Sequence, residues 1–357
     1  VYHFLELLGC RFYGKTVAGN EEIVPQIATL VVGDYNVVES PFVKQRVINN
    51  NDFFASDSVK LELFADWAAK SRFNTFQLGL REIDETYDPT ILQKRGIDIH
   101  LATHNWTQFT PGGTFQPQWD DETQFQIFLD NVIAYAQDHP EAVSIGAWQE
   151  DSSQGKYRVD VDGDLYRFTE LNLYTMNRIA EAFVAADLPH RVLWMAYVEG
   201  NVPPDPTVIQ PHPRVDLYYF NIVQDYAYPL ENYHNSKYPD FHQGRYIEHL
   251  FENSDWEPFP LSDQNVSPRS RALQWSNYLD TVNFTGDVIV VDHLNANIGW
   301  WINDMKQTFT PLGIWGDGVL EADIEYHNQL GFTGWANTFE YPFWQHTPGP
   351  YWWRRAA

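Results

Sequence analysis

The chain has 357 residues, of which 44% are hydrophobic and 16% are aromatic, so it can bury the core of one large α/β domain. Its 48 acidic and 23 basic residues give a formal charge of −25, which argues against binding to nucleic acid or anionic membranes, because both require clustered lysine and arginine. The single cysteine, Cys10, excludes an intrachain disulfide and a cysteine-based metal site, and no apolar run approaches the ~20 residues that membrane insertion requires.

The pattern of the first 42 residues indicates the C-terminal part of a small N-terminal α/β domain. Residues 1–8 have a helical pattern, Gly9 is typical of a helix end, and after a turn residues 27–39 predict short strands. Pro41 marks the boundary, so we expect the remnant of one domain at 1–42 and a second domain at 43–357. Because the chain opens within a helical pattern and without Met, we expect that a leader or a further domain precedes it, and that the protein is extracellular or periplasmic.

Predicted strands and helices alternate from residue 43 onward. Apolar runs of strand length occupy 43–49, 74–80, 97–104, 143–150, 191–198, 215–222, 286–292 and 332–338. Helical patterns with one apolar face occupy 59–70, 125–137, 165–186, 269–281 and 319–330. Eight strands in this order predict a (β/α)8 TIM barrel with helices outside, rather than a doubly wound sheet. The link between the fifth and sixth strands is proline-rich without a clear helix, and we interpret the aromatic segment 223–267 as a loop that shapes a substrate site.

Acidic residues follow three of the predicted strands. Glu150 ends the fourth strand, Asp225 follows the sixth, and Asp292 ends the seventh. The carboxyl ends of barrel strands meet at one rim, where TIM-barrel enzymes place their chemistry. Glycoside cleavage needs a carboxylic acid beside the leaving oxygen and a second carboxylate across the sugar ring. The pattern therefore predicts a glycoside hydrolase, with Glu150 as acid and the two aspartates on the base side, in an inverting arrangement.

Each of these acids has an alternative role. Glu150 and Asp225 are also compatible with solvated loop acids, and Asp292 with a helix N-cap. Asp151 becomes the acid if the register shifts by one residue, and Glu199 is a candidate for a third catalytic acid.

Aromatic and polar residues at the strand ends predict a sugar-binding pocket. Aromatic faces stack on sugar rings, and amide, imidazole and carboxylate groups bond their hydroxyls. The substrate-binding candidates are His104, Asn105, Trp106, Trp148, Asp151, Tyr197, Glu199, Asn221, His293, Trp300, Trp315, Trp335, Asn337 and Glu340. Core packing is the alternative for the tryptophans, and a buried structural amide or a capped turn for the asparagines. The 12 histidines form no His-Glu-x-x-His motif and no nucleotide-binding glycine loop occurs, so we expect neither metal nor cofactor.

Several segments resemble a known family. FLELLGCRFYG, EEIVPQ and SPFVKQR are similar to the junction between the N-terminal α/β domain and the barrel in α-glucuronidase-like glycoside hydrolases. They resemble even more an uncharacterised bacterial domain family related to these enzymes, as does AYVEGNVPPDP. The resemblance implies a hydrolase that degrades polysaccharides, with Glu150 as general acid and Asp225 and Asp292 on the base side, Asp292 standing where the family has Glu.

Two departures from that family concern the sugar. The family holds the carboxylate of its uronic acid with a lysine and an arginine, and Gly146 and Met195 stand at those positions here. We therefore do not expect glucuronic acid as the recognised sugar, although glycosidic cleavage remains the expectation. A non-catalytic carbohydrate-binding barrel, a polysaccharide lyase and a scaffold protein are the competing interpretations.

Overall fold

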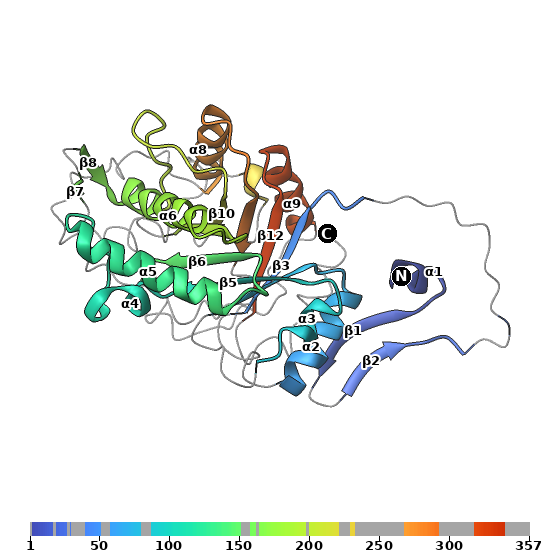
Figure 1. Cartoon of the computed structure of the whole chain (residues 1–357). Helices are drawn as coiled ribbons and strands as arrows, with labels where there is room; N and C mark the ends of the chain where they lie inside the picture. Colours follow the sequence, from blue (N-terminus) through green and yellow to red (C-terminus); the bar gives the residue numbers. More distant parts are fainter. Residues whose placement is uncertain are drawn as a thin grey trace, which may run out of the picture.

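The barrel is closed and parallel. The computed structural model describes residues 2–16, 19–26, 29, 40–50, 58–79, 87–150, 158–161, 164–197, 200–220, 229–232, 268–292 and 318–339. Around the ring, each strand pairs in parallel with the next, and β12 closes on β3 (Figure 1). The strands are β3 (Gln45–Asn50), β4 (Thr75–Leu78), β5 (Asp98–His104), β6 (Ser144–Trp148), β9 (Arg191–Ala196), β10 (Val215–Phe220), β11 (Val288–Asp292) and β12 (Gly334–Phe339). Each coincides with a predicted strand, which confirms the TIM barrel.

Helices cover the outside of the barrel, as the apolar helix faces predict. The longer ones are α2 (Ser58–Lys70), α5 (Glu122–Asp138), α6 (Phe168–Ala185), α8 (Pro268–Thr281) and α9 (Val319–Gln329). Short turns add α3 (Thr90–Gln93), α4 (Trp106–Phe109), η2 (Pro111–Gly113) and η4 (Leu230–Asn232). Residues 201–214, which link β9 to β10, contain no α-helix, as their prolines predict.

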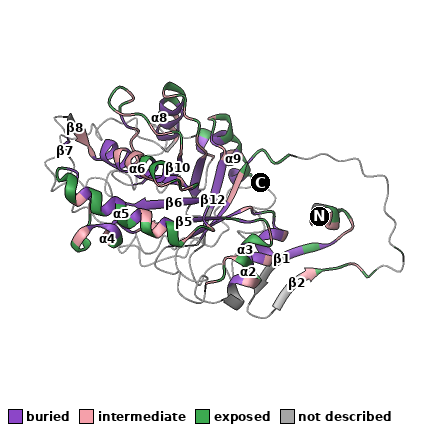
Figure 2. Ribbon diagram, viewed as in Figure 1, coloured by how far each residue is buried: buried purple, intermediate pink, exposed green. Residues whose placement is uncertain are grey.

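Successive strand residues pack into two different cores. Along each strand, side chains point alternately outward, toward the helices, and inward, into the barrel. Trp194, Tyr219 and Trp335 are examples of the outward-facing set. Figure 2 shows that the barrel strands are mostly buried. The inner core is apolar toward the carboxyl ends of the strands and consists of Val47, Ala102, Trp148, Leu193, Met195, Tyr197, Tyr218, Phe220, Ile289, Val291 and Ala336.

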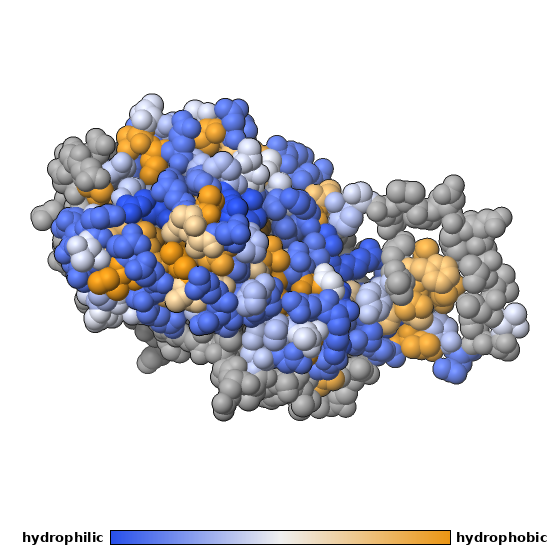
Figure 3. All heavy atoms as spheres, viewed as in Figure 1, coloured by the Kyte–Doolittle hydropathy of each residue, from blue (hydrophilic) through white to orange (hydrophobic). Residues whose placement is uncertain are grey.

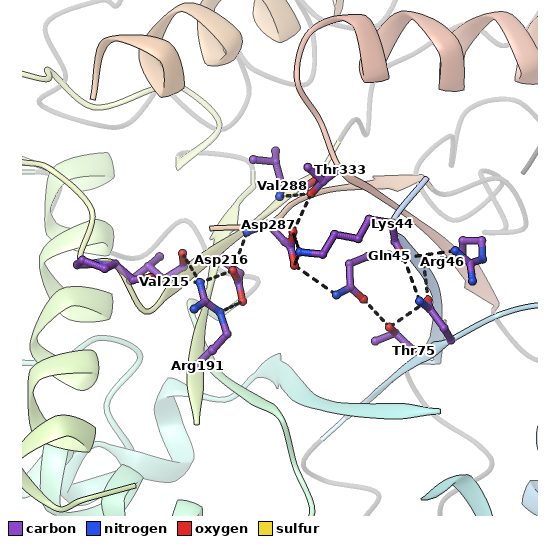
Figure 4. A network of polar contacts seen from close by, with 12 residues as sticks. Lys44, Gln45, Arg46, Thr75, Arg191, Val215, Asp216, Asp287, Val288 and Thr333 are labelled. Atoms are coloured by element: carbon purple, nitrogen blue, oxygen red, sulfur yellow. Dashed lines mark hydrogen bonds and ion pairs between the residues drawn. The ribbon is translucent and has the colours of Figure 1, made fainter. Parts of the chain in front are cut away.

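A polar network lies at the amino-terminal end of the barrel (Figure 4). Arg191 forms two 2.7 Å hydrogen bonds with Asp216, and the backbone N–H of Asp287 donates a third to the same carboxylate, also at 2.7 Å. Lys44 contacts both oxygens of Asp287 at 2.7 and 2.9 Å. Burial raises the pKa of Asp216 more than Arg191 lowers it. TIM-barrel enzymes place their chemistry at the opposite rim, so we expect this network to contribute to stability.

The N-terminal elements pack on α2. Helix α1 (Tyr2–Leu7) is followed within two residues by Gly9, whose φ is +92°, so the helix stops near the glycine that the sequence predicts as its end. An antiparallel hairpin, β1 (Arg11–Thr16) and β2 (Gly19–Ile23), follows where the sequence predicts a turn, while the predicted strands at 27–39 lie outside the described residues apart from residue 29. Lys70 of α2 forms a 2.6 Å ion pair with Glu22. Figure 3 shows apolar surface over these elements, where Phe4, Leu7, Ile23 and Val24 are exposed.

A second hairpin, β7 (Arg158–Val161) and β8 (Asp164–Arg167), precedes α6 and was likewise not predicted. Among the helices described, none has the length and apolar character needed to cross a membrane.

Candidate active site at the carboxyl rim of the barrel

The segment that follows β5 is joined to the end of β6. Asn105 is fully buried, accepts a 2.8 Å hydrogen bond from the N–H of Trp148 and donates one of 3.2 Å to the carbonyl of Gly146. Its own N–H bonds the carbonyl of Trp148 at 3.1 Å. The neighbouring indole of Trp106 donates to the carbonyl of Ala147 at 2.7 Å. These hydrogen bonds satisfy buried backbone groups at the end of β6 that would otherwise lack a partner, and they fix the segment after β5 relative to β6.

His104 continues the same contact at the mouth of the barrel. Its Nδ1 lies 2.5 Å from the carbonyl oxygen of Gln149, which can only accept, so Nδ1 is the donor of this hydrogen bond. Its ring centroid lies 5.4 Å from that of Tyr197. The side chain of Gln149 donates to the carbonyl of Tyr197 at 3.0 Å and accepts from Asn172 of α6 at 2.6 Å. The ends of β5, β6 and β9 are thereby held together.

Glu150 stands directly beyond the end of β6 and is held by Thr107. Oε1 of the carboxylate accepts a 2.8 Å hydrogen bond from the N–H of Thr107 and a 2.6 Å bond from its hydroxyl. Thr107 belongs to α4, the turn that the previous contacts fix against β6. The predicted acid is therefore at the rim that the prediction requires, in a partly buried and oriented position.

Trp148 lies inside the barrel rather than in its mouth. Its indole is 2% exposed, donates to the carbonyl of Leu193 at 2.9 Å and meets the ring of Phe220 edge-on at 5.7 Å. The indole lies over Gly146, because a Cβ added at Gly146 would be 2.6 Å from Nε1 of Trp148. A side chain at position 146 and this placement of the indole are therefore incompatible.

Two further candidate tryptophans lie in the outer core. Trp106 is fully buried and Trp335 is 1% exposed, and both pack among residues that face the helices. Trp335 has the ring of His327 from α9 at 5.3 Å. These contacts correspond to the core-packing alternative, and a role in sugar binding stays a prediction for both. Tyr197, 5% exposed, lines the inner core instead.

The backbone of Asp292, the predicted base-side residue of the seventh strand, lies on the far side of the ring from Glu150. Asp292 ends β11 and pairs in register with Asn337 of β12. Strands β9 and β10 separate β6 from β11 on one side, and four strands separate them on the other. The backbone positions of Glu150 and Asp292 are thus across the barrel from each other at the same rim. The remaining candidates lie outside the described residues: Asp151, Glu199, Asn221, Asp225, His293, Trp300, Trp315 and Glu340.

The two arginines Arg46 and Arg95 lie away from this rim. Arg46 bonds the backbone carbonyls of Arg72 and Val43, and Arg95 forms a 2.5 Å ion pair with Glu62. Within the described part of the chain, no group of three or more His, Cys, Asp or Glu residues is arranged to hold a metal ion. Sequence reasoning missed Thr107, Gln149 and Asn172 as parts of the site, because nothing in their local sequence indicates a contact with a distant strand end.

Comparison with solved structures finds similarity at low identity. A D-allulose 3-epimerase from Methylomonas sp. is 11% identical, covering 84% of this chain and 86% of that one, with a TM-score of 0.39. A β-N-acetylhexosaminidase from Bacteroides fragilis is 12% identical over 84% of this chain and 61% of that one, with a TM-score of 0.45. An endo-1,4-β-mannanase from Rhizomucor miehei is 10% identical over 92% and 89%, with a TM-score of 0.42. Similarity at this level carries no argument about activity.

The sequence itself is more informative about family. No curated protein matches it. A family described as "Domain of unknown function (DUF4838)" matches residues 16–244, which is well over half of the chain and includes the strands from β3 to β10. The chain belongs to this family.

Proposed function

We propose that the protein is a glycoside hydrolase that cleaves a polysaccharide or its oligosaccharides without a cofactor, outside the cytoplasm. Glu150 is the general acid, and Asp292 and Asp225 form the base side. The observation that carries this proposal is the Glu150 carboxylate at the carboxyl rim of β6, with one oxygen fixed by two donors of Thr107. General-acid catalysis requires a carboxyl group held at a defined position beside the leaving oxygen.

The position of Asp292 supports an inverting mechanism. An inverting enzyme needs room for a water molecule between the sugar and the base, which places its two carboxyl groups roughly 6.5–9.5 Å apart. Strands on opposite sides of a ring provide a wider separation than neighbouring strands do, and β6 and β11 are so arranged. The resemblance to α-glucuronidase-like enzymes assigns the same residues. Gly146 and Met195 in place of the family's cations favour a sugar other than glucuronic acid.

The test is Glu150→Gln, assayed against a panel of plant and bacterial polysaccharides by release of reducing ends. The amide oxygen of glutamine accepts both bonds from Thr107, so the loop keeps its partners while the proton donor is lost. We expect kcat to fall by roughly 10²–10⁴-fold, the usual contribution of general-acid catalysis. Glu325→Gln, the same change on the exposed face of α9, is the matched control and should leave kcat unchanged. Activity of Glu150→Gln equal to that of the control would refute the assignment.

The panel also separates the competing functions. Binding to a glycan without turnover, in a sample that unfolds cooperatively, indicates a carbohydrate-binding barrel. A rise in ultraviolet absorbance from an unsaturated product indicates a lyase.

A further inference from the structure

We infer that Thr107 is a positioning residue that orients the Glu150 carboxyl group for proton transfer; this inference rests on the proposed function. Both donors of Thr107, the N–H at 2.8 Å and the hydroxyl at 2.6 Å, engage Oε1. Two donors from one residue, one in the backbone and one in the side chain, restrict the rotation of the carboxyl group more than a single bond would. Thr107 thereby fixes the direction in which the carboxyl group points.

The rigidity of α4 makes Thr107 suited to this role. The adjacent indole of Trp106 is fully buried and bonded to Ala147 at 2.7 Å, and Asn131 of α5 donates to the carbonyl of Phe109 at 2.8 Å. The turn is therefore tied both to β6 and to the helix that covers it. Thr107 and Glu150 are both held in fixed positions relative to β6. The carboxylate is therefore already oriented before substrate binds.

The hydroxyl of Thr107 acts in the chemical step. The proton of the Glu150 carboxyl group passes to the glycosidic oxygen as the C–O bond breaks, and the bonding electrons remain with that oxygen. Water supplies a hydroxyl to the anomeric carbon and its proton to the base-side carboxylate. Glu150 becomes negative during this transfer, and hydrogen bonds to an ionised acceptor are about twice as strong as neutral ones. The two bonds from Thr107 therefore strengthen in the transition state, which affects kcat rather than KM.

A capping role accounts for only one of the two bonds. A carboxylate at the start of a helical turn accepts from a backbone N–H in any protein, and the Thr107 N–H is such a group. The side-chain hydroxyl is a separate donor from the same residue to the same oxygen. Replacing the hydroxyl alone therefore isolates the positioning role.

The experiment compares Thr107→Val with Thr107→Ser and with Thr110→Val. Valine keeps the shape and the N–H but lacks the hydroxyl, and serine restores the hydroxyl. Thr110→Val removes a hydroxyl bond of the same 2.6 Å length in the same segment, donated to the carbonyl of Thr114. We expect Thr107→Val to lower kcat roughly 10- to 100-fold, the range for a bond to a charged group, with KM within about twofold. Thr107→Ser should recover most of the loss, and Thr110→Val should affect stability without this loss of kcat.

The leaving group provides the decisive signature. An aryl glycoside with an acidic phenol needs little protonation, so Thr107→Val should slow it much less than it slows a substrate with a sugar leaving group. In the Glu150→Gln background, Thr107→Val should add no further loss. Equal effects on both substrates, multiplicative effects in the double variant, or no recovery with serine would overturn the inference. Should Thr107→Val fail to fold, Thr107→Ala removes the same hydroxyl without the branched methyl groups.

The proposed function and the role of Thr107 can be refuted separately. Wild-type protein that hydrolyses nothing on the panel, or full activity in Glu150→Gln, overturns the proposed function together with the inference. Loss of activity in Glu150→Gln beside normal kcat in Thr107→Val overturns the inference alone.

Discussion

The ion pair between Arg191 and Asp216 should stabilise the barrel far more than the neighbouring pair between Lys44 and Asp287. Both have nitrogen–oxygen distances of 2.7 Å, and they differ mainly in burial. The side chain of Asp216 is 5% exposed and that of Arg191 34%, whereas the side chain of Lys44 is 67% exposed. If the contact distance alone decided the contribution, the two ion pairs would stabilise the protein equally. If desolvation matters, loss of the buried pair should cost more than loss of the exposed pair.

The perturbations are Arg191→Met and Lys44→Met. Removing one partner of a buried pair costs about 3–5 kcal/mol, because the other charge remains buried, and the partial exposure of Arg191 argues for the lower end, about 3 kcal/mol. In Arg191→Met, Asp216 keeps the N–H of Asp287 as a donor but loses both bonds from the guanidinium. Lys44→Met should cost less than about 1 kcal/mol, as for an exposed pair.

Urea unfolding followed by tryptophan fluorescence at neutral pH measures both changes in unfolding free energy. The cost of Arg191→Met should shrink as the pH falls, because protonation of Asp216 removes the unpaired charge, and the pKa of that group is already raised by burial. Neither variant should change kcat, since both pairs lie at the end of the barrel opposite Glu150. Equal losses in the two variants, or a loss below about 1 kcal/mol in Arg191→Met, would refute the role assigned to burial.

Two further changes test the packing of the barrel. Gly146→Ala should lower the unfolding free energy by about 1–3 kcal/mol, because the added Cβ would meet Trp148 Nε1 at 2.6 Å and Ala102 Cβ at 2.7 Å. Adding Ala102→Gly removes one of these two contacts and should restore part of the lost stability. A double variant that is no more stable than Gly146→Ala would contradict this explanation. Burial lowers the pKa of His327 to about 4 from 6.5, so its contribution to stability is present above pH 6.5 and is lost as the pH falls toward 4, by about 1.4 kcal/mol per pH unit. His327→Phe should flatten the acid limb of a plot of unfolding free energy against pH, and an unchanged slope would exclude this histidine as a cause.

Strand β10 shows what the sequence could predict and what it could not. The run VDLYYF is buried along its whole length as β10, and such a run predicts a strand covered on both sides. Its alternation between Tyr218 inside the barrel and Tyr219 beneath the helices does not show in the sequence, because both faces are apolar. For the same reason the sequence did not distinguish Trp148, which lies inside the barrel, from Trp335, which lies outside it.

The amino-acid sequence by itself determined the order of strands and helices and the position of Glu150 at a strand end, because hydrophobic periodicity and the polarity that follows a buried run are local properties. Only the tertiary structure decided which groups meet. Thr107 and Glu150 are 43 residues apart, and Arg191 and Asp216 are 25 apart. Those contacts depend on the register of parallel strands around a closed ring, which is set by packing of the whole barrel rather than by any segment of it.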